Sequence, residues 1–235
     1  MTSDYRDRLY TAYAATHAGV ADESSAALAF ARDILPHLPS DPKAVVVDLG
    51  CGQGQLVRQL IVHGYANARG IDVSLEQVQL AHAAGVTQVE HGDFRVVFDG
   101  SSLDVVTATD FFEHLTKEEN LEAMDSVYGA LRPGGRLIMR VPNSVSPFGG
   151  NFRYGDITHE TSFTARSIRQ ISAAVGFAST SVYACPPPVH GVKSLMRRAV
   201  WKGASGAMKL ALAAETGQVH GHLVTQNIVA VLKKD

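Results

Sequence analysis

The sequence has little cysteine and no strong excess of charge of either sign. Cysteine occurs only as Cys51 and Cys185 in 235 residues. These two residues have neither the spacing of metal ligands nor the density of a disulfide-stabilised secreted domain. The formal net charge is -2, which gives no general basic character for binding nucleic acid. We therefore expect two reduced thiols and no nucleic-acid partner.

Long apolar runs are also missing. No window approaches the roughly 18 consecutive apolar residues of a membrane-spanning helix, and residues 1–6 lack the apolar core of a signal peptide. We therefore expect a cytoplasmic protein. A length of 235 residues suits one α/β domain with some chain to spare, so we expect a single domain, 1–235, with an insertion or extra helices.

What the sequence does contain is a strand, a glycine-rich turn and a helix in succession. Residues 45–49 begin with three valines, which is typical of a strand buried on both faces. Glycines at 50, 52 and 54 follow directly, and residues 55–65 have the apolar spacing of a helix. Because the first N–H groups of a helix have no partner within it, this order places hydrogen-bond donors around a bound ligand. It predicts half of a mononucleotide-binding unit.

The spacing of the glycines argues against a dinucleotide. A G-x-G-x-x-G fingerprint would need glycine at position 55, where the chain has Gln55. A second short apolar run, residues 68–72, ends in Asp72 about twenty residues after the turn, where a carboxylate can accept both ribose hydroxyls. Taken alone, the glycines could also form a tight strand-to-helix turn that binds no ligand.

These two motifs, residues 47–54 and 70–72, resemble the first two motifs of the class I S-adenosylmethionine-dependent methyltransferases. The resemblance implies an α/β fold with a doubly wound, mostly parallel seven-stranded sheet, and S-adenosyl-L-methionine as the cofactor. It also implies N-terminal cap helices, a cofactor-binding core at 45–142 and an antiparallel last strand beside strand five. The residues expected at the cofactor are Asp48, Gly50, Cys51, Gly52, Gly54, Asp72, Val73, Asp93, Phe94, Thr109 and Asp110.

The remaining elements follow from apolar patterns, caps and breakers. We expect Ser74 and Thr164 to be helix N-caps. We expect strands at 45–49, 68–72, 86–90, 103–108, 136–141, 179–184 and 225–232, and helices at 26–35, 55–65, 74–84, 118–131 and 165–175.

The segment after the strand at 103–108 is the expected reactive edge, since open α/β sheets bind ligands at the carboxyl ends of their strands. In the resemblance, an acid-plus-histidine signature falls on Glu113 and His114, with Asp110 near the sulfonium. We expect His114 and Asp110 to be catalytic candidates. A packing or capping role for His114 stays open, as does an ordinary turn for Asp93.

The segment 143–164 is long, rich in glycine, and crowded with polar and aromatic residues, which favours a functional loop and an acceptor pocket. The resemblance adds the N-terminal cap, 1–40, as a second wall, although simple packing explains that segment equally well. The substrate-binding candidates are Tyr13, His17, Asn143, Arg153, Tyr154, Asp156 and Glu160.

His159 is the candidate general base, because an alcohol nucleophile must lose its proton as the new bond forms. Two alternatives stay open: a structural histidine that pins the loop, and a divalent-metal site with Asp156 and Glu160. No metal ligand is assigned. The polar content of the loop suits a hydroxyl-rich acceptor, and the N-terminal tyrosines resemble those of methyltransferases from polysaccharide gene clusters.

We therefore expect methyl transfer to a hydroxyl of a saccharide or a saccharide-carrier conjugate. A quinone or natural-product O- or N-methyltransferase and a catalytically silent cofactor-binding module are the alternatives. An NAD-dependent oxidoreductase is disfavoured by Gln55 and by the lack of a Tyr-x-x-x-Lys pair. The oligomeric state is left open.

The helical insertion at 192–214 mixes apolar residues with Lys193, Arg197, Arg198, Lys202 and Lys209. One interpretation is that its apolar face packs on the domain. The other is that its basic residues bind an anionic membrane surface or a phosphorylated acceptor. We expect the glycines at 203 and 206 to break it into two pieces.

Overall fold

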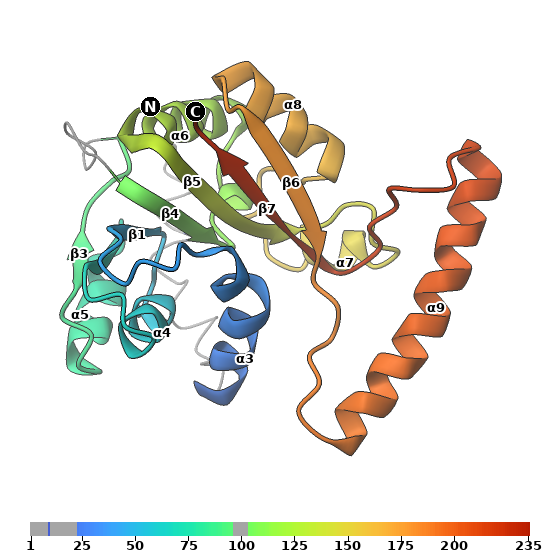
Figure 1. Ribbon diagram of the computed structural model, residues 1–235, viewed down its shortest axis with the longest axis horizontal. Coiled ribbons are helices and arrows are strands. Elements are labelled where there is room, and N and C mark those ends of the chain that lie inside the picture. The colour runs from blue at the N-terminus through green and yellow to red at the C-terminus, as the bar shows by residue number, and fades with distance from the viewer. Residues whose placement is uncertain (1–8, 10–22, 96–102) are drawn as a thin grey trace.

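The computed structural model describes residue 9, residues 23–95 and residues 103–235 (Figure 1). The strands are β1 (Val46–Leu49), β2 (Ala68–Asp72), β3 (Val89–His91), β4 (Leu103–Thr109), β5 (Leu131–Pro142), β6 (Ser179–Ala184) and β7 (Asn227–Lys233). The helices are α3 (Glu23–Asp33), α4 (Gln55–Val62), α5 (Leu75–Ala83), α6 (Lys117–Ala130), α7 (Gly149–Arg153), α8 (Ala165–Val175) and α9 (Val192–Thr216). Two short 3-10 helices are η1 (Leu35–His37) and η2 (Phe112–His114).

The strands form one seven-stranded sheet in the order β3-β2-β1-β4-β5-β7-β6. Strands β1 to β5 are parallel, and β7 runs antiparallel to both β5 and β6. The chain winds outward in both directions from β1 and β4, which creates a topological switch point at their carboxyl ends. The predicted doubly wound fold and the antiparallel seventh strand beside strand five are confirmed.

Helices cover both faces of the sheet (Figure 1). Residues of β1 alternate between the two layers: Val46 packs with Phe30 and Leu60 of α3 and α4, whereas Val47 packs in the layer that contains Met124 of α6. Because helices pack on both faces of β1, every residue of this strand is buried. This explains the unbroken run of β-branched residues in the sequence.

The predicted caps at Ser74 and Thr164 are confirmed. The Ser74 hydroxyl accepts from the backbone N–H of Gln77, and Thr164 forms a capping box with Ser167. Thr116 and Glu119 form a further capping box at the start of α6. The boundaries differ most at β3, which is confined to 89–91, and at β5, which already begins at Leu131.

Helix α9 corrects one prediction, because it runs without interruption through Gly203 and Gly206. A helical glycine costs about 1 kcal/mol relative to alanine, and neighbouring Ala, Lys and Met residues are strong enough helix formers to bridge both positions. The helix stands apart from the body of the molecule (Figure 1). Among the described parts of the chain, no helix combines the length and hydrophobicity needed to cross a lipid bilayer.

The insertion also fails to dock its apolar face on the described domain. Val192, Met196, Val200 and Leu210 are 76%, 65%, 74% and 72% exposed, and α9 has no substantial packing partner among the described elements. Its first turn is tied to the preceding loop, where Arg198 donates to the Pro187 carbonyl at 2.7 Å.

Candidate functional site

The site is centred on the glycine turn after β1. Gly50 has φ +63°, and a β-carbon there would lie 2.6 Å from the ring of Phe111. Gly52 has φ +51°, and the nearest atom to a β-carbon there is 3.9 Å away. Both positions lie in the left-handed region that favours glycine. The turn therefore needs glycine at 50 for space as well as backbone conformation, while at 52 it leaves the backbone open to a ligand.

Asp72 connects the end of β2 to this turn. One carboxylate oxygen accepts from the backbone N–H of Gly52 and the other from that of Ser74, both at 2.8 Å. Burial raises the pKa of Asp72, and these two hydrogen bonds oppose the rise. Each carboxylate oxygen can accept a second hydrogen bond, so Asp72 is fixed in place and retains the capacity to bind two hydroxyls.

A cavity of about 390 Å³ lies beside the glycine turn. It is enclosed by α3, the turn, the start of α4 and the ends of β4 and β5, with Phe30, Asp33, Asp48, Cys51, Thr109 and Asp110 among its lining residues. The Thr109 hydroxyl is buried and has no hydrogen-bond partner in residues 23–95 and 103–235. A ligand with a polar group would satisfy it, since buried hydroxyls without partners are costly.

Asp48 lies at the floor of this cavity and is 3% exposed. It accepts from the Thr107 hydroxyl at 2.7 Å. Burial raises the pKa of Asp48 to about 7. The neighbouring Cys51 thiol is free, and its pKa is raised far above the ordinary range by burial, so it is an inert wall of the site rather than a nucleophile. Cys185 is also free.

An ion network positions Asp110 at the end of β4. Asp110 has φ +53°, the one positive φ among the described residues other than glycine. Its carboxylate accepts from the Arg140 guanidinium, and Arg140 also lies 3.4 Å from the carboxylate of Asp33 on α3. Sequence reasoning missed Arg140 and Asp33. The available signal was an arginine placed between the apolar residues Met139 and Val141 of β5.

The expected adenine side of the site is less defined. Val73 is 63% exposed, and Phe94 is buried with its ring edge-on to that of Phe111. Asp93 forms an ion pair with Arg95 at 2.7 Å. A carboxylate so paired can still accept a hydrogen bond from an amine, and the role of Asp93 toward adenine stays a prediction.

The predicted acceptor loop, 143–164, is fastened to the reactive edge. The Glu113 carbonyl accepts from the backbone N–H groups of Glu160 and Thr161, at 2.8 and 2.9 Å. The Thr161 hydroxyl donates to the carbonyl of Leu115 at 2.6 Å. These bonds bring His159 beside η2, although the two segments are far apart in the sequence.

Two predicted substrate-binding residues form hydrogen bonds that stabilise the structure. Asn143 is 1% exposed and donates to the carbonyls of Leu223 and Thr225, at 2.7 and 2.9 Å. These bonds hold Asn143 in the interior of the described chain, and its predicted contact with substrate stays a prediction. The Arg153 guanidinium donates to the carbonyls of His159 and Glu160 and so stabilises the loop.

The other candidates are more dispersed. Tyr154 is 81% exposed. Asp156 accepts from the hydroxyl of Thr158 at 2.6 Å, and the role of Glu160 toward a substrate stays a prediction. Tyr13 and His17 lie outside the described residues. Of the predicted N-terminal wall, the described helix α3 does line the cavity.

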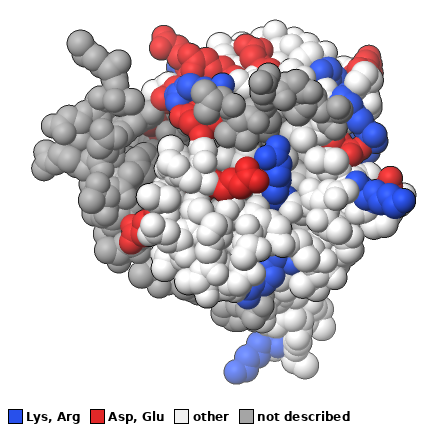
Figure 2. Space-filling model, turned by 90° about the vertical axis from the view of Figure 1, so that its left-hand side faces the viewer, with Lys and Arg blue, Asp and Glu red and all other residues white. Residues whose placement is uncertain are grey.

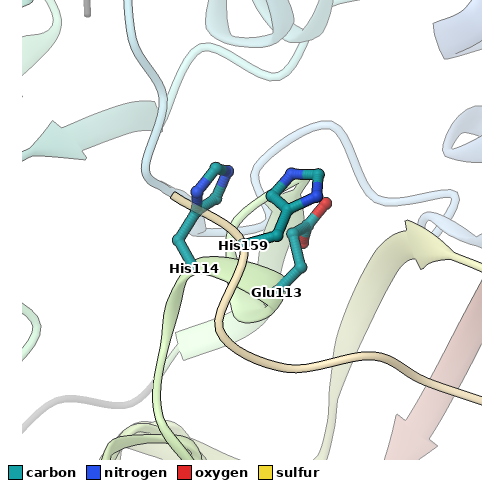
Figure 3. A group of neighbouring side chains, drawn as sticks. All are labelled: Glu113, His114 and His159. Atoms are coloured by element: carbon teal, nitrogen blue, oxygen red, sulfur yellow. The ribbon is translucent and has the colours of Figure 1, made fainter. Parts of the chain in front are cut away.

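Two histidines meet at the reactive edge (Figure 3). The rings of His114 and His159 are edge-on, with centroids 4.8 Å apart. His114 Nδ1 lies 2.9 Å from the hydroxyl oxygen of Thr158, which itself donates to Asp156. His159 Nδ1 lies 2.8 Å from the carbonyl of Phe152. Because a carbonyl only accepts, His159 carries its proton on Nδ1.

Glu113 completes this group and was missed as a site residue. It is 1% exposed, and within the described part of the chain neither carboxylate oxygen has a hydrogen-bond partner. Burial raises the pKa of Glu113 well above its usual value and lowers that of His114 to about 4. The acid-plus-histidine pair was visible in the sequence, but its proximity to His159 was not.

Charged side chains of both signs lie on the face of the molecule shown in Figure 2. On the face drawn in Figure 2, acidic and basic side chains are interspersed among wide uncharged areas, with no extended basic surface over the described residues.

Comparisons with known proteins agree with this architecture. Residues 47–139 match the sequence profile of the methyltransferase domain. A trans-aconitate 2-methyltransferase of Azoarcus sp. is 35% identical over 128 residues, which are 53% of this chain and 48% of that protein. The chain thus spans about half the length of this curated relative.

Solved structures match over a larger part of the chain. A SAM-dependent methyltransferase from Archaeoglobus fulgidus superposes with a TM-score of 0.68 at 17% identity, covering 96% of this chain and 99% of that one. Phosphoethanolamine N-methyltransferase 2 of Haemonchus contortus, in complex with S-adenosyl-L-methionine, gives a TM-score of 0.63 at 16% identity, covering 99% and 60%. Residues 47–139 therefore match a methyltransferase domain, and the chain has the Rossmann-like fold of S-adenosylmethionine-dependent methyltransferases.

Proposed function

We propose that this protein is a methyltransferase that binds S-adenosyl-L-methionine and transfers its methyl group to an oxygen of a small acceptor molecule. The observation that carries the proposal is the position of Asp72, held between Gly52 and Ser74 at the edge of the glycine turn. The matching domain profile over 47–139 supports it.

The residues present suit this cofactor. Asp72 would accept hydrogen bonds from the ribose hydroxyls, and Val73 offers an exposed apolar surface to the adenine. The methionine portion would extend into the cavity, where the Thr109 hydroxyl lacks a partner among the residues that the structure describes. The Asp110 carboxylate there can face a positive sulfonium. When bound, the cofactor supplies a methyl group on a positively charged sulfur, so the protein mainly aligns the acceptor and excludes water.

Calorimetric titration of S-adenosylhomocysteine into the wild type and into Asp72→Asn tests the cofactor site. Hydrogen bonds from a neutral donor to a charged acceptor contribute about 1.5–3 kcal/mol each. We expect the substitution to weaken binding at least tenfold, while the exposed-site control Asp125→Asn leaves it unchanged. Tight NADH binding instead, or equal affinities in both variants, would refute the proposal.

We infer that the acceptor oxygen belongs to a hydroxyl-rich molecule such as a saccharide. The described side chains at the reactive edge are rich in acids, and their cations are engaged: Arg140 pairs with Asp110 and Asp33, and Arg153 binds loop carbonyls. A polycarboxylate would meet repulsion there, whereas neutral hydroxyls can donate to acidic side chains.

A carboxylate acceptor is the second candidate, because the relative from Azoarcus sp. is named a trans-aconitate 2-methyltransferase. Incubating the protein with labelled cofactor and either trans-aconitate or a panel of sugars and sugar nucleotides separates the two. A base-labile methyl ester would support the carboxylate, and a base-stable methyl ether would support the hydroxyl. Turnover on either acceptor would rule out a catalytically silent module.

His159 is the proposed general base for a hydroxyl acceptor. Its Nδ1–H donates to Phe152, so the lone pair is on Nε2, and the side chain is 12% exposed. Replacing His159 with Ala should lower kcat about 10²-fold or more and leave cofactor affinity intact. The control is His82→Ala, which also removes an imidazole hydrogen-bonded to a carbonyl. An unchanged kcat at saturating acceptor would refute the base role.

We also propose that α9 contacts an anionic membrane surface. Its exposed face carries Val192, Met196, Val200 and Leu210, and its cations outnumber its single acid, Glu215. Such a helix binds at the interface through apolar burial together with attraction to anionic lipid.

A further inference from the structure

We propose that Glu113, His114 and His159 form a binding site for a divalent transition-metal ion at the reactive edge of the sheet. One ligand atom from each residue lies within 4.8 Å of the other two. The three side chains extend in the same direction from η2 and from the loop that crosses it (Figure 3). This set shares only His159 with the metal-site alternative in the sequence, Asp156, His159 and Glu160.

The distances suit a site that closes on its ion. Nitrogen and oxygen ligands lie about 2.0–2.2 Å from a zinc ion. Atoms already within 4.8 Å of one another reach that arrangement through small side-chain rotations. Both supporting segments are fixed, because the Glu113 carbonyl accepts from the loop N–H groups of Glu160 and Thr161.

The hydrogen bonds of the two rings select the nitrogen that would bind the ion. His159 donates from Nδ1 to the carbonyl of Phe152. Thr158 uses its hydroxyl hydrogen toward Asp156, at 2.6 Å, so its oxygen accepts from Nδ1 of His114. Both rings therefore carry a lone pair on Nε2. A carbonyl or hydroxyl behind each imidazole is the arrangement that orients histidine ligands in metal sites.

Glu113 is the independent observation that calls for a positively charged ligand. Both of its oxygens are buried and have no hydrogen-bond partner among the described residues, and an uncompensated buried carboxylate is costly. A cation bound between the carboxylate and the two imidazoles would remove this cost.

The ligand types indicate the class of ion. Two imidazoles and one carboxylate suit zinc and similar first-row divalent ions, and three protein ligands leave at least one position open. Magnesium is disfavoured because it prefers oxygen ligands and octahedral geometry.

The role of the ion in catalysis rests on the proposed function. An acceptor hydroxyl bound at the open position would lose its proton to water more readily, because the ion stabilises the alkoxide. The alkoxide oxygen then forms a bond to the methyl carbon as the carbon–sulfur bond breaks, and the sulfur keeps the bonding electrons. The products are a methyl ether, S-adenosylhomocysteine and one proton. Ion binding would replace the general-base role proposed above for His159, because its Nε2 lone pair would then bind the ion.

Cobalt titration of the untagged, chelator-treated full chain tests the site, with the visible absorption of Co²⁺ as the readout and Zn²⁺ as the competitor. We expect one equivalent of Co²⁺ to bind and Zn²⁺ to displace it. Glu113→Gln should weaken binding at least tenfold, since even residues behind the ligands contribute 10–100-fold. The control Glu118→Gln, at an exposed position, should bind as the wild type does.

Failure to bind a stoichiometric ion, or equal affinity in Glu113→Gln and wild type, would overturn the inference. Circular dichroism reports whether Glu113→Gln folds, and His159→Asn serves as a second ligand variant if it does not. S-adenosylhomocysteine binding is measured on the same samples. Cofactor binding without ion binding refutes the metal site alone, whereas ion binding without cofactor binding refutes the proposed function alone.

Discussion

At the residue scale, Gly50 shows how one missing side chain shapes the site. We expect Gly50→Ala to destabilise the protein, because the new methyl group would meet Phe111 in a backbone conformation that is strained for alanine. The left-handed conformation alone costs about 1–2 kcal/mol. Gly85→Ala is the matched control, since Gly85 has φ +84° but no neighbour within 4 Å. Urea unfolding should show a larger loss for position 50, and equal losses would argue against the clash.

The buried Asp48 predicts a dependence of stability on pH. Its pKa is raised by burial to about 7 from 3.8, so the folded state holds a proton that the unfolded state releases between these values. The proton held by Asp48 in the folded state therefore contributes its full stabilisation below pH 4, and this contribution is lost as the pH rises to 7. Asp48→Asn should therefore raise the Tm relative to wild type at pH 8, by roughly 2–4 °C per kcal/mol gained, and the difference should vanish near pH 4. A difference that is the same at both pH values would contradict this.

How well the sequence revealed individual residues depended on how local their setting was. Asp72 was predictable because its partner Gly52 belongs to a strand-turn-helix unit with regular spacing. The hydrogen bonds of Asn143 were not predictable, because polar side chains that bind distant carbonyls look the same in sequence as those that bind substrate. The meeting of Glu113 with His159 depends on a loop folding back over the sheet, which no short-range pattern encodes.

At the element scale, the central strands and capped helices were predictable because their signals are short-range. The β-branched run of β1 and the hydroxyl caps at Ser74 and Thr164 each act within a few residues. The continuity of helix α9 was not predictable in this way. It depends on the summed helix propensity of all its residues, in which the surrounding helix formers outweigh the two glycines.

The low helix propensity of Gly203 and Gly206 gives a prediction for α9. A methyl group added at position 203 or 206 would have no atoms within 4 Å, so alanine fits at both. Each Gly→Ala substitution should stabilise the helix by about 1 kcal/mol and slow amide hydrogen exchange in α9 about fivefold. Because α9 has no substantial packing partner among the described elements, the global Tm should not change. A rise in global Tm equal to the local gain would show that α9 unfolds together with the domain.

At the scale of the whole molecule, α9 is an insertion in a β-hairpin. Strands β6 and β7 pair antiparallel, with Ala184 opposite Ile228, so the chain leaves and re-enters the sheet at neighbouring positions. The contacts that fix the re-entering chain, from Asn143 to the carbonyls of Leu223 and Thr225, lie outside the helix. The sheet and the glycine turn therefore owe little to α9.

We expect a variant in which residues 190–220 are replaced by a short Gly-Ser linker to fold and to bind S-adenosylhomocysteine within about twofold of wild type. A short loop is the natural connection of an antiparallel strand pair, so the sheet keeps its pairing. Sedimentation with vesicles should then separate the two roles: the full chain should bind vesicles containing phosphatidylserine, lose binding as salt screens the charges, and ignore neutral vesicles, while the shortened variant binds neither. Vesicle binding by the shortened variant would place the membrane contact elsewhere, and loss of cofactor binding on excision would show that α9 supports the site.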